Sequence, residues 1–462
     1  MIGLVVNPVA GVGGPAGLAG SDGAAVQARA AEHGSVPRAG GRAVQAMAII
    51  ARAHPGVRIL TAAGAMGAAA VAEAGLEPVV VFTPVGDPTS PEDTAAAVAA
   101  VAAAGATLVL VAGGDGTLRD AVRGLTPPPG SSSEDAAGAR LPGSLSEDAA
   151  GALLPGSLSE GASGARLPGS LSEDASGARL PGSLSEDAAG ARDETPSPSG
   201  HRAPSRSARS TPTGRPAVLG IPAGVKMYSP VFAVSPVAAG SLAADWIGPD
   251  PVPTAEREVL DVDEAALRRA RVEPVLYGTL RVPQRLGRTQ ARKAPTPATE
   301  EAAVASAARA AVAAMRPGVR YLLGPGGTTA RIAAELGVAK TPLGVDVVLD
   351  GAVIAAGADE RRLLDEVAAG PAQAVVTVIG GQGFLLGRGN QQLSARVIRA
   401  MGSAPLLVVA PEQKLVDLAG RPLLVDTGDA ELDAALAGHV RVITGAAATA
   451  FYAVSAPETT PV

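Results

Sequence analysis

Residues 108–120 read Leu-Val-Leu-Val-Ala-Gly-Gly-Asp-Gly-Thr-Leu-Arg-Asp and form the most informative stretch of the chain. Its apolar first half predicts a buried β-strand, and the glycines that follow predict a tight turn before a helix. Glycines in such a turn let backbone N–H groups approach an anion closely, and the N-terminus of the next helix adds partial positive charge. The stretch therefore predicts a strand–turn–helix unit with an anion-binding turn. The residues predicted to bind the anion are Gly113, Gly114, Gly116 and Thr117.

Asp115 lies within this turn, at the carboxyl end of the predicted strand. Open α/β sheets bind their ligands at that end of their strands. A carboxylate beside a phosphate loop does not bind the phosphate directly; it holds a metal ion or accepts a proton from a hydroxyl nucleophile. The structural alternative is an ordinary tight turn in which Asp115 only caps the helix. The motif Gly-Gly-Asp-Gly-Thr after a strand favours function, and we predict that Asp115 is catalytic.

Strands and helices alternate on both sides of this unit. A helix predicted over residues 91–104 has Ser90 as its N-cap and Pro91 as its first residue, which is a common way for a helix to begin. Such alternation indicates βαβ units and a parallel sheet, so the N-terminal part is predicted to be a Rossmann-like α/β domain. The other predicted elements are strands over residues 4–6, 57–61, 78–82, 107–112 and 217–221 and a helix over residues 40–53.

A low-complexity segment at residues 128–215 interrupts this pattern. A unit of 13 residues runs five times in it, and four copies begin with Leu-Pro-Gly-Ser-Leu-Ser-Glu. Each unit has too few apolar residues to offset its ordering entropy, so we predict a long disordered insertion; the alternative is a structural repeat. The predicted division is an N-terminal domain of residues 1–127 and 216–250, the insertion, and a C-terminal domain of residues 251–462.

The C-terminal part returns to an α/β pattern with some β-rich sections. Its apolar runs each lead into a turn that contains Gly or Pro, as strands of a sheet do. We therefore predict a second domain of α/β or β-rich type. Its predicted elements are strands over residues 276–282, 321–323, 375–379 and 406–410 and helices over residues 298–315 and 330–336.

Composition excludes several classes of protein. The chain has 462 residues and a formal net charge of −6, which argues against a nucleic-acid binder. The absence of cysteine excludes disulfides, thiolate metal sites and Cys nucleophiles, and the four scattered histidines predict no metal-ligand cluster. The first residues lack a basic region, and the longest uncharged run, between Asp93 and Asp115, is broken by Gly105. We therefore expect a cytoplasmic protein without a signal peptide or membrane span, and we expect a homo-oligomer.

Two further glycine-rich loops are candidates for ligand binding. The loop Gly324-Pro325-Gly326-Gly327-Thr328-Thr329 follows a predicted strand and precedes a helix. It is either a second phosphate cradle, formed by Gly326, Gly327 and Thr328, or a connection that merely needs small residues. The loop at residues 380–392, which contains Gly381 and Asn390, is either part of a nucleotide pocket or a mobile surface loop.

Two charged residues complete the candidates. Lys226 follows Pro222-Ala223-Gly224 and is either a cation for phosphate or a solvated side chain. Asp346 stands in an apolar run, and because a buried unpaired carboxylate is costly, Asp346 is either paired or functional. Of these two alternatives, structural pairing is favoured.

The motif at residues 113–117 resembles the nucleotide motif shared by NAD kinases and the related diacylglycerol, sphingosine and phosphofructokinase families. Other segments resemble the ATP-NAD kinase-like branch that includes the acetoin-catabolism X proteins. These segments are Gly3-Leu4-Val5-Val6-Asn7-Pro8 with Gly11, Gly13 and Gly14, the segment at 220–229, Leu343-Gly344-Val345-Asp346, and the segments at 380–384 and 387–391. They span most of the chain outside the insertion.

The resemblance implies phosphoryl transfer. Asp115 would act as general base toward the adenosine 2′-hydroxyl of NAD, with Mg²⁺ or another divalent cation and with ATP or polyphosphate as donor. It also implies nucleotide substrates as partners and nucleotide binding by Asn7, the turn at 113–117, Lys226, Gly326, Gly327, Thr328, Gly381 and Asn390.

The chain departs from the classical NAD kinases at one point. They carry a downstream Asn-Glu or Asn-Asp pair that recognises the dinucleotide, whereas this sequence has only two asparagines, Asn7 before Pro8 and Asn390 before Gln391. The acceptor is therefore left open by the sequence. The alternatives are a lipid kinase of the diacylglycerol type and a non-catalytic nucleotide-binding regulatory protein of acetoin-type catabolism.

Overall fold

A computed structural model describes residues 1–18, 24–126, 214–262, 274–285, 287–291, 300–446 and 448–456. These residues belong to one compact unit that comprises Met1–Pro129 and Pro212–Val462. The repeats of the predicted insertion lie outside the described residues. None of the helices in the described ranges combines the length and the apolar character that crossing a bilayer requires.

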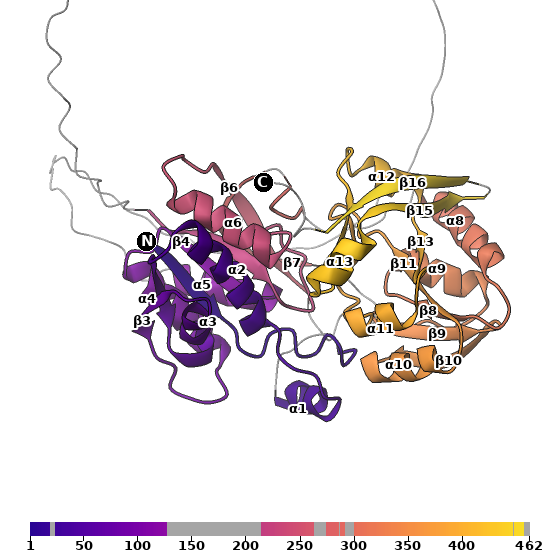
Figure 1. The fold of residues 1–462 in the computed structure, drawn as a ribbon, viewed down its shortest axis with the longest axis horizontal. Helices are drawn as coiled ribbons and strands as arrows, with labels where there is room; N and C mark the ends of the chain where they lie inside the picture. Colours follow the sequence, from indigo (N-terminus) through magenta and orange to yellow (C-terminus); the bar gives the residue numbers. More distant parts are fainter. Residues whose placement is uncertain are drawn as a thin grey trace, which may run out of the picture. The chain divides into compact units, whose positions relative to one another are not determined.

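The N-terminal part contains a five-stranded parallel sheet in the order β3-β2-β1-β4-β5 (Figure 1). Its central strands are almost purely aliphatic and buried along their whole length, as expected for a sheet covered on both faces. The predicted parallel sheet is therefore confirmed. The strands are β1 (Ile2–Val6), β2 (Arg58–Ala62), β3 (Glu77–Phe82), β4 (Leu108–Gly113) and β5 (Ala217–Pro222).

The order of the strands creates a switch point between β1 and β4. The chain runs from β1 to β2 on one side, whereas β5 lies on the other side of β4. Because crossovers between parallel strands are right-handed, connections in opposite directions put their helices on opposite faces. Accordingly, α2 (Ala39–Ala53) packs with α6 (Pro236–Ile247), and α4 (Pro91–Ala103) packs with α5 (Asp115–Leu125). The shorter helices are α1 (Ala24–Glu32), η1 (Gly64–Met66) and α3 (Ala68–Glu73).

Local sequence signals explain the helix starts. The Ser90 hydroxyl accepts a hydrogen bond from the Asp93 backbone N–H at 3.1 Å, and the Asp93 carboxylate accepts one from the Ser90 backbone N–H at 2.8 Å. This reciprocal capping box, with Pro91 as the first residue, begins α4 as the sequence predicts.

An antiparallel ribbon packs beside this sheet. It consists of β6 (Thr254–Asp261) and β7 (Val275–Pro283), and both strands contact α5. β7 also contacts β5. The ribbon brings Asp261, at the end of β6, close to the start of α5, where the Gly-Gly-Asp-Gly-Thr turn lies.

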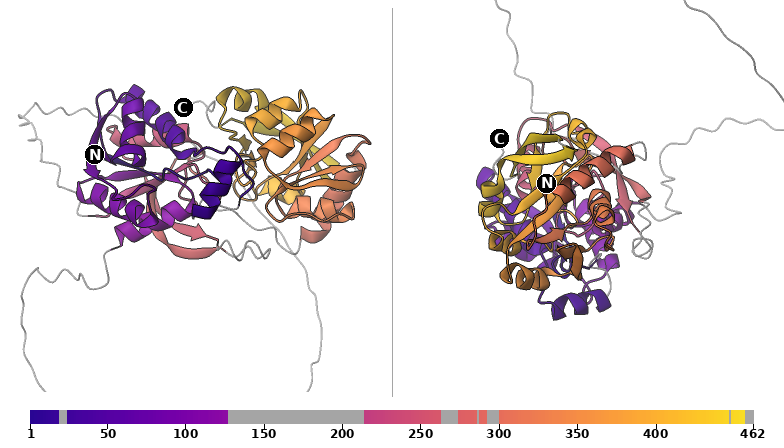
Figure 2. Two further views of the ribbon diagram at one scale, coloured as in Figure 1. Left: turned by 90° about the horizontal axis from the view of Figure 1, so that it is seen from below. Right: turned by 90° about the vertical axis from the view of Figure 1, so that its right-hand side faces the viewer.

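The C-terminal part contains a nine-stranded mixed sheet in the order β10-β9-β8-β11-β13-β15-β16-β14-β12, which confirms a second domain of α/β type. Neighbouring residues of one strand belong to separate hydrophobic clusters. Val375 belongs to the cluster that contains residues of α8 and α9, and Val376 belongs to the cluster that contains residues of α10–α13. Helices thus cover both faces of this sheet (Figure 2). The strands are β8 (Arg320–Leu323), β9 (Val345–Leu349), β10 (Ala352–Ala358), β11 (Ala372–Thr377), β12 (Phe384–Leu386), β13 (Leu406–Val409), β14 (Leu423–Val425), β15 (Gly438–Gly445) and β16 (Ala448–Ser455). The helices are α8 (Glu301–Ala314), α9 (Gly327–Glu335), α10 (Glu360–Ala368), α11 (Ala395–Ala400), α12 (Glu412–Val416) and α13 (Ala430–Leu436).

Candidate functional site

The switch point of the N-terminal sheet brings Asn7 to the Gly-Gly-Asp-Gly-Thr turn. Asn7 follows β1, and its backbone N–H donates to Ala112 O at 3.0 Å. Its side-chain Nδ2 donates to the Thr117 Oγ1 at 3.2 Å. The same Oγ1 accepts from the Gly114 backbone N–H at 3.4 Å, so Thr117 joins the turn to the end of β1. The structure thus places Asn7 and Thr117 together at the edge where such sheets bind ligands.

Asp115 is the first residue of α5, and its side chain is fully buried. Its Oδ2 accepts a hydrogen bond from the Tyr228 backbone N–H at 2.6 Å. Its Oδ1 accepts from the Ser229 backbone N–H at 3.1 Å and from the Ser229 hydroxyl at 2.6 Å. These two partners are not among the site residues predicted from the sequence, although both belong to the segment at 220–229 that carries part of the family resemblance. The carboxylate therefore ties the turn to the segment that follows β5.

The surroundings of Asp115 change its acidity. Burial raises the pKa of this carboxyl group to about 6, against the opposing effect of the hydrogen bonds from Ser229 and Tyr228. The negative charge of Asp261 contributes a smaller part of this rise. A carboxyl group with this pKa is ionised at neutral pH and is a better proton acceptor than an ordinary aspartate. Burial, together with the charges of Asp115 and Asp261, also raises the pKa of the Tyr228 phenol to about 12, so this phenol stays protonated.

The glycines of the turn permit close packing of two backbones. A Cβ atom on Gly113 would lie 2.2 Å from the Thr117 Oγ1. A Cβ atom on Gly224 would lie 2.3 Å from the Gly114 Cα, and one on Gly114 would lie 3.0 Å from the Lys226 carbonyl oxygen. A side chain at any of these positions would clash with neighbouring protein atoms, so glycine is required there. Gly114 and Gly116 are also partly exposed, which leaves part of the turn accessible to a ligand.

Lys226 is held in a cluster of charges beside the turn. Its Nζ lies 3.4 Å from Asp261 Oδ1 and donates to Val262 O at 3.2 Å. The Arg119 guanidinium of α5 lies 3.1 Å from Asp261 Oδ2. The interpretation of Lys226 as a solvated side chain is therefore wrong, because the side chain is mostly buried and ion-paired. Two cations flank the buried Asp261 carboxylate near the start of α5.

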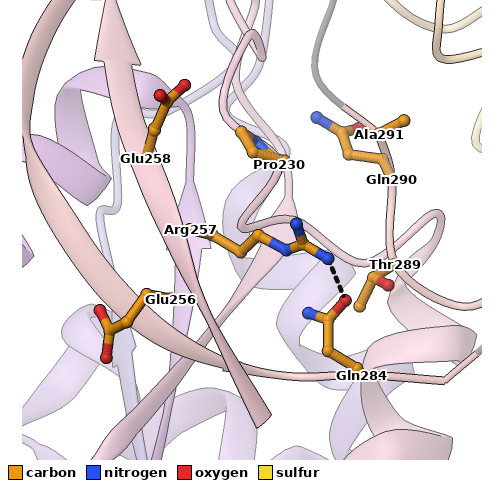
Figure 3. Close-up of a pocket in the computed structure, with 8 residues that line it drawn as sticks. All are labelled: Pro230, Glu256, Arg257, Glu258, Gln284, Thr289, Gln290 and Ala291. Atoms are coloured by element: carbon orange, nitrogen blue, oxygen red, sulfur yellow. Dashed lines mark hydrogen bonds between the residues drawn. The ribbon is translucent and has the colours of Figure 1, made fainter.

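A cavity of about 420 Å³ lies beside Pro230. This residue directly follows Tyr228 and Ser229, whose backbone N–H groups bind the Asp115 carboxylate. Figure 3 shows the Arg257 side chain reaching across it to Gln284, with a hydrogen bond of 2.7 Å. The Gln290 Nε2 donates to the Met227 and Ser229 carbonyl oxygens at 3.3 and 3.0 Å. The cavity therefore borders the segment at residues 227–230, which includes the two residues that bind Asp115. Its lining contains none of the predicted site residues. The lining residues are Pro230, Glu256, Arg257, Glu258, Gln284, Thr289, Gln290 and Ala291.

The loop at residues 380–392 packs against residues 224–227, which lie between β5 and the residues that bind Asp115. The Gln382 Nε2 donates to Met227 O at 3.0 Å, and the Gln391 Nε2 donates to Gly224 O at 3.2 Å. Both glutamines are buried, so the interpretation as a mobile surface loop is wrong. Asn390 is used within the loop, since its Oδ1 accepts from the Gly387 N–H at 2.9 Å and its Nδ2 donates to Leu385 O at 2.8 Å.

The remaining predicted residues lie elsewhere. Gly381 adopts a φ of 76°, and its carbonyl oxygen accepts from Arg421 at 3.1 Å. Gly326 is the N-cap of α9, and Gly327 and Thr328 are its first two residues. This helix packs on the C-terminal sheet. The prediction that Asp346 is paired is confirmed: its carboxylate accepts from the Thr341 backbone N–H and hydroxyl and from the Gly357 N–H, and it lies 3.1 Å from Lys340 Nζ.

The family resemblance implies a phosphate donor and a divalent cation. The residues of this site suit the phosphate better than the cation. The start of α5 and the partly exposed glycines suit a phosphate. Asp115 presents no oxygen to a cation, because both oxygens face N–H or O–H donors. In the described ranges, no group of three or more His, Asp or Glu side chains is placed to hold a metal ion. The residues therefore do not fit a cation held by the protein alone.

Comparison with protein families identifies two matches. The ATP-NAD kinase C-terminal domain matches residues 316–454, which carry the nine-stranded sheet. The diacylglycerol kinase catalytic domain matches residues 68–162, which include β4 and the Gly-Gly-Asp-Gly-Thr turn. Comparison with curated proteins and with solved structures gives no match. Both matched models describe domains of the NAD kinase and diacylglycerol kinase superfamily, in agreement with the resemblance of the sequence motifs.

Proposed function

We propose that this protein is a kinase that transfers a phosphoryl group from ATP or polyphosphate to the 2′-hydroxyl of NAD. Both matched domains belong to kinase families and indicate a phosphotransferase. The observation that carries the proposal is the Asn7–Thr117 hydrogen bond of 3.2 Å, which joins the two loops at the switch point of the parallel sheet. Parallel α/β sheets bind phosphorylated ligands at such a point, against the N-terminus of the following helix.

Asp115 would act as the proton acceptor. As the acceptor oxygen forms its bond to phosphorus, the bond to the leaving group breaks and the hydroxyl proton passes to a base. The Ser229 hydroxyl has one proton and two acceptors within reach, Asp115 Oδ1 at 2.6 Å and Leu260 O at 3.0 Å. Rotation of this hydroxyl toward Leu260 O removes one of the two donors to Asp115 Oδ1 and leaves the Ser229 backbone N–H in place. Because a carboxylate oxygen has two lone pairs, Oδ1 would then accept from a substrate hydroxyl as well. A pKa of about 6 supports this role at neutral pH.

The two family matches support different acceptors. The ATP-NAD kinase C-terminal domain is the longer of the two matched stretches and supports NAD as the acceptor. The diacylglycerol kinase catalytic domain includes the Asp115 turn and supports a lipid hydroxyl as the second candidate. A divalent cation would accompany the phosphate donor, and a cytoplasmic homo-oligomer is part of the same proposal.

The test uses the purified full chain with Mg²⁺ and either ATP or polyphosphate. NAD and diacylglycerol are offered separately, and NADP or phosphatidic acid is quantified. NADP formed by the wild type and lost in Asp115→Asn supports the proposal, whereas phosphatidic acid supports the second candidate. Nucleotide binding without product from either acceptor contradicts both and favours a non-catalytic binding protein.

Asp115→Asn alone does not separate chemistry from folding, because Asp115 also anchors the segment after β5. Ser229→Ala provides the matched control, since it removes one donor to the carboxylate and keeps the base. If activity falls with thermal stability to the same degree in both variants, Asp115 is only structural. A loss of activity in Asp115→Asn that exceeds its loss of stability supports a proton acceptor.

A further inference from the structure

Three arginines form a largely buried charge cluster that the proposed reaction does not use. They are Arg38 at the N-cap of α2, Arg42 in the first turn of this helix, and Arg388 in the loop at residues 380–392. Arg42 and Arg388 share the carboxylate of Asp426, to which each donates at 2.6 Å. Among the described residues, no other carboxylate lies within 4 Å of any of the three guanidinium groups. The cluster therefore holds more positive than negative charge.

Two of these guanidinium groups, those of Arg38 and Arg42, lie side by side. A Cβ atom on Gly428 would lie 2.1 Å from Arg38 Nη2 and 3.9 Å from Arg42 Nη1, so both groups approach one point. Burial and the neighbouring Arg42 charge lower the pKa of Arg38, against the opposing effect of Asp426. Like charges at such a position repel, and water screens their repulsion less than it does at an open surface. A bound anion would relieve this repulsion.

Both side chains keep donor groups that the protein does not use. Arg38 donates through Nη2 to Thr427 O at 2.7 Å, and Arg42 donates through Nη2 to Asp426. Among the described residues, Arg38 Nε, Arg38 Nη1 and Arg42 Nη1 have no hydrogen-bond partner, and these three atoms keep accessible surface. Arg42 Nε also lacks a partner, but it is enclosed. Three nitrogen atoms on two neighbouring guanidinium groups are therefore available to a ligand.

Arg38 and Arg42 line a small cavity beside the segment that follows β5. Its volume is about 10 Å³, which is the room that one water molecule needs. Gly11, with a φ of 84°, forms another part of the wall, and a Cβ atom on it would lie 2.3 Å from Ala223 O. The described residues that line the cavity include no carboxylate, and the Gln391 Oε1 atom, an acceptor that would repel an anion, is enclosed. The cavity is therefore small, tightly walled and positively charged.

We propose that Arg38 and Arg42 bind a single small anion of the size of chloride in this cavity. Such an ion accepts hydrogen bonds from the unused N–H groups and supplies the negative charge that the cluster lacks. Chloride is only slightly larger than a water molecule, whereas phosphate is several times larger and does not fit a space for one water molecule. Gly387 and Gln391 line the same cavity, so the bound ion would hold α2 against the loop at residues 380–392. The site shares no residue with the Asp115 turn and does not rest on the proposed function.

The test measures the thermal midpoint of the full chain while sodium chloride replaces sodium gluconate at constant ionic strength. A ligand that binds only the folded protein raises this midpoint with its concentration. Raising chloride from about 1 to about 300 mM should raise the wild-type midpoint by about 3 °C. Arg38→Gln removes the charge and the unused guanidinium donors of Arg38, so its midpoint should hardly respond to chloride. Because the response to chloride is compared, a lower stability of this variant does not decide the outcome.

Arg421→Gln is the matched control. Arg421 is also half-buried and donates to the carbonyl oxygens of Leu418 and Gly381, both at 3.1 Å, but it does not line the cavity. This variant should keep the full response to chloride.

Three results would overturn the proposal. A wild-type midpoint that does not depend on chloride would show that water alone occupies the cavity. An equal response in Arg38→Gln would show that chloride acts elsewhere on the protein. A larger rise with sodium phosphate than with chloride, lost in Arg38→Gln, would overturn the assignment to an ion of chloride size.

Discussion

The Arg42 guanidinium donates to Asp426 Oδ1 at 2.6 Å, although 384 residues separate the two in the chain. Arg42 belongs to α2 of the N-terminal sheet, and Asp426 directly follows β14 of the C-terminal sheet. Arg388 also donates to the Asp426 carboxylate at 2.6 Å and to Val234 O at 2.9 Å. Three buried charged side chains thus connect elements of the two sheets. Arg42 shares a small cavity with Ala223 and Gly224, which follow β5.

Replacing Asp426 with Asn should destabilise the protein strongly. The substitution leaves the buried Arg42 and Arg388 guanidinium groups without a counter-charge. Removing one partner of a buried ion pair costs about 3–5 kcal/mol. Urea unfolding followed by circular dichroism measures this loss of the free energy of unfolding.

The control is Glu77→Gln, which breaks the exposed Arg58–Glu77 pair. Exposed pairs contribute about 0–1 kcal/mol, so the midpoint should hardly change. Equal effects of the two substitutions would contradict the role assigned to Asp426.

Stability should fall in acid through the same carboxyl group. Burial alone would raise the pKa of Asp426, but the charges and hydrogen bonds of Arg42 and Arg388 outweigh it and lower the pKa to about 2. Because the folded pKa lies below the ordinary value of 3.8, the stabilisation is complete above about pH 4 and is lost as the pH falls toward 2. It amounts to about 2 kcal/mol.

Urea unfolding at several pH values measures this loss. The difference in stability between the wild type and Asp426→Asn should shrink between pH 4 and pH 2. A difference that stays constant across this range would show that Asp426 does not titrate there.

The rate of phosphoryl transfer should rise with pH around the pKa of Asp115, if the proposed function holds. The ionised carboxylate accepts the proton, and its pKa is about 6. Ser229→Ala removes a hydrogen bond that favours the ionised form, so the midpoint of the pH–rate profile should move to higher pH. Product formation measured from pH 5 to 8 tests this shift.

Ser235→Ala serves as the control for this profile. Ser235 is also buried, but its hydroxyl caps α6 by accepting from the Ala238 N–H. Its removal should lower stability and leave the midpoint of the profile in place. A midpoint that does not move in Ser229→Ala would argue against Asp115 as the titrating base.

The contact between Gly114 and Gly224 should not tolerate a side chain. Gly224→Ala would place a methyl group 2.3 Å from the Gly114 Cα and force the two backbones apart. Such overpacking costs about 1–3 kcal/mol and should also disturb the turn. Gly41→Ala, where nothing lies within 4 Å, is the matched control for a thermal melting comparison. A Gly224→Ala variant as stable as this control would refute the close packing.

Elements with a local signal in the sequence were predicted correctly. The aliphatic run of β4, the glycines after it and the Ser90–Pro91 start of α4 each predict an element from neighbouring residues, and the structure confirms all three. Short strands such as β12 and β14, each of three residues, were missed because three residues show no periodicity. The loop at 380–392 was not predicted to be buried, since only tertiary contacts bury its glutamines.

The parallel N-terminal sheet, the strand–turn–helix unit and Asp115 as the candidate base could all be predicted from neighbouring residues, because periodicity and turn chemistry act over a few residues. The surroundings of these groups depend on the folded chain. It joined Asp115 to Ser229, Lys226 to Asp261 and Arg42 to Asp426. Burial and pairing set the pKa of a carboxylate, and both depend on partners that the chain brings together from distant positions.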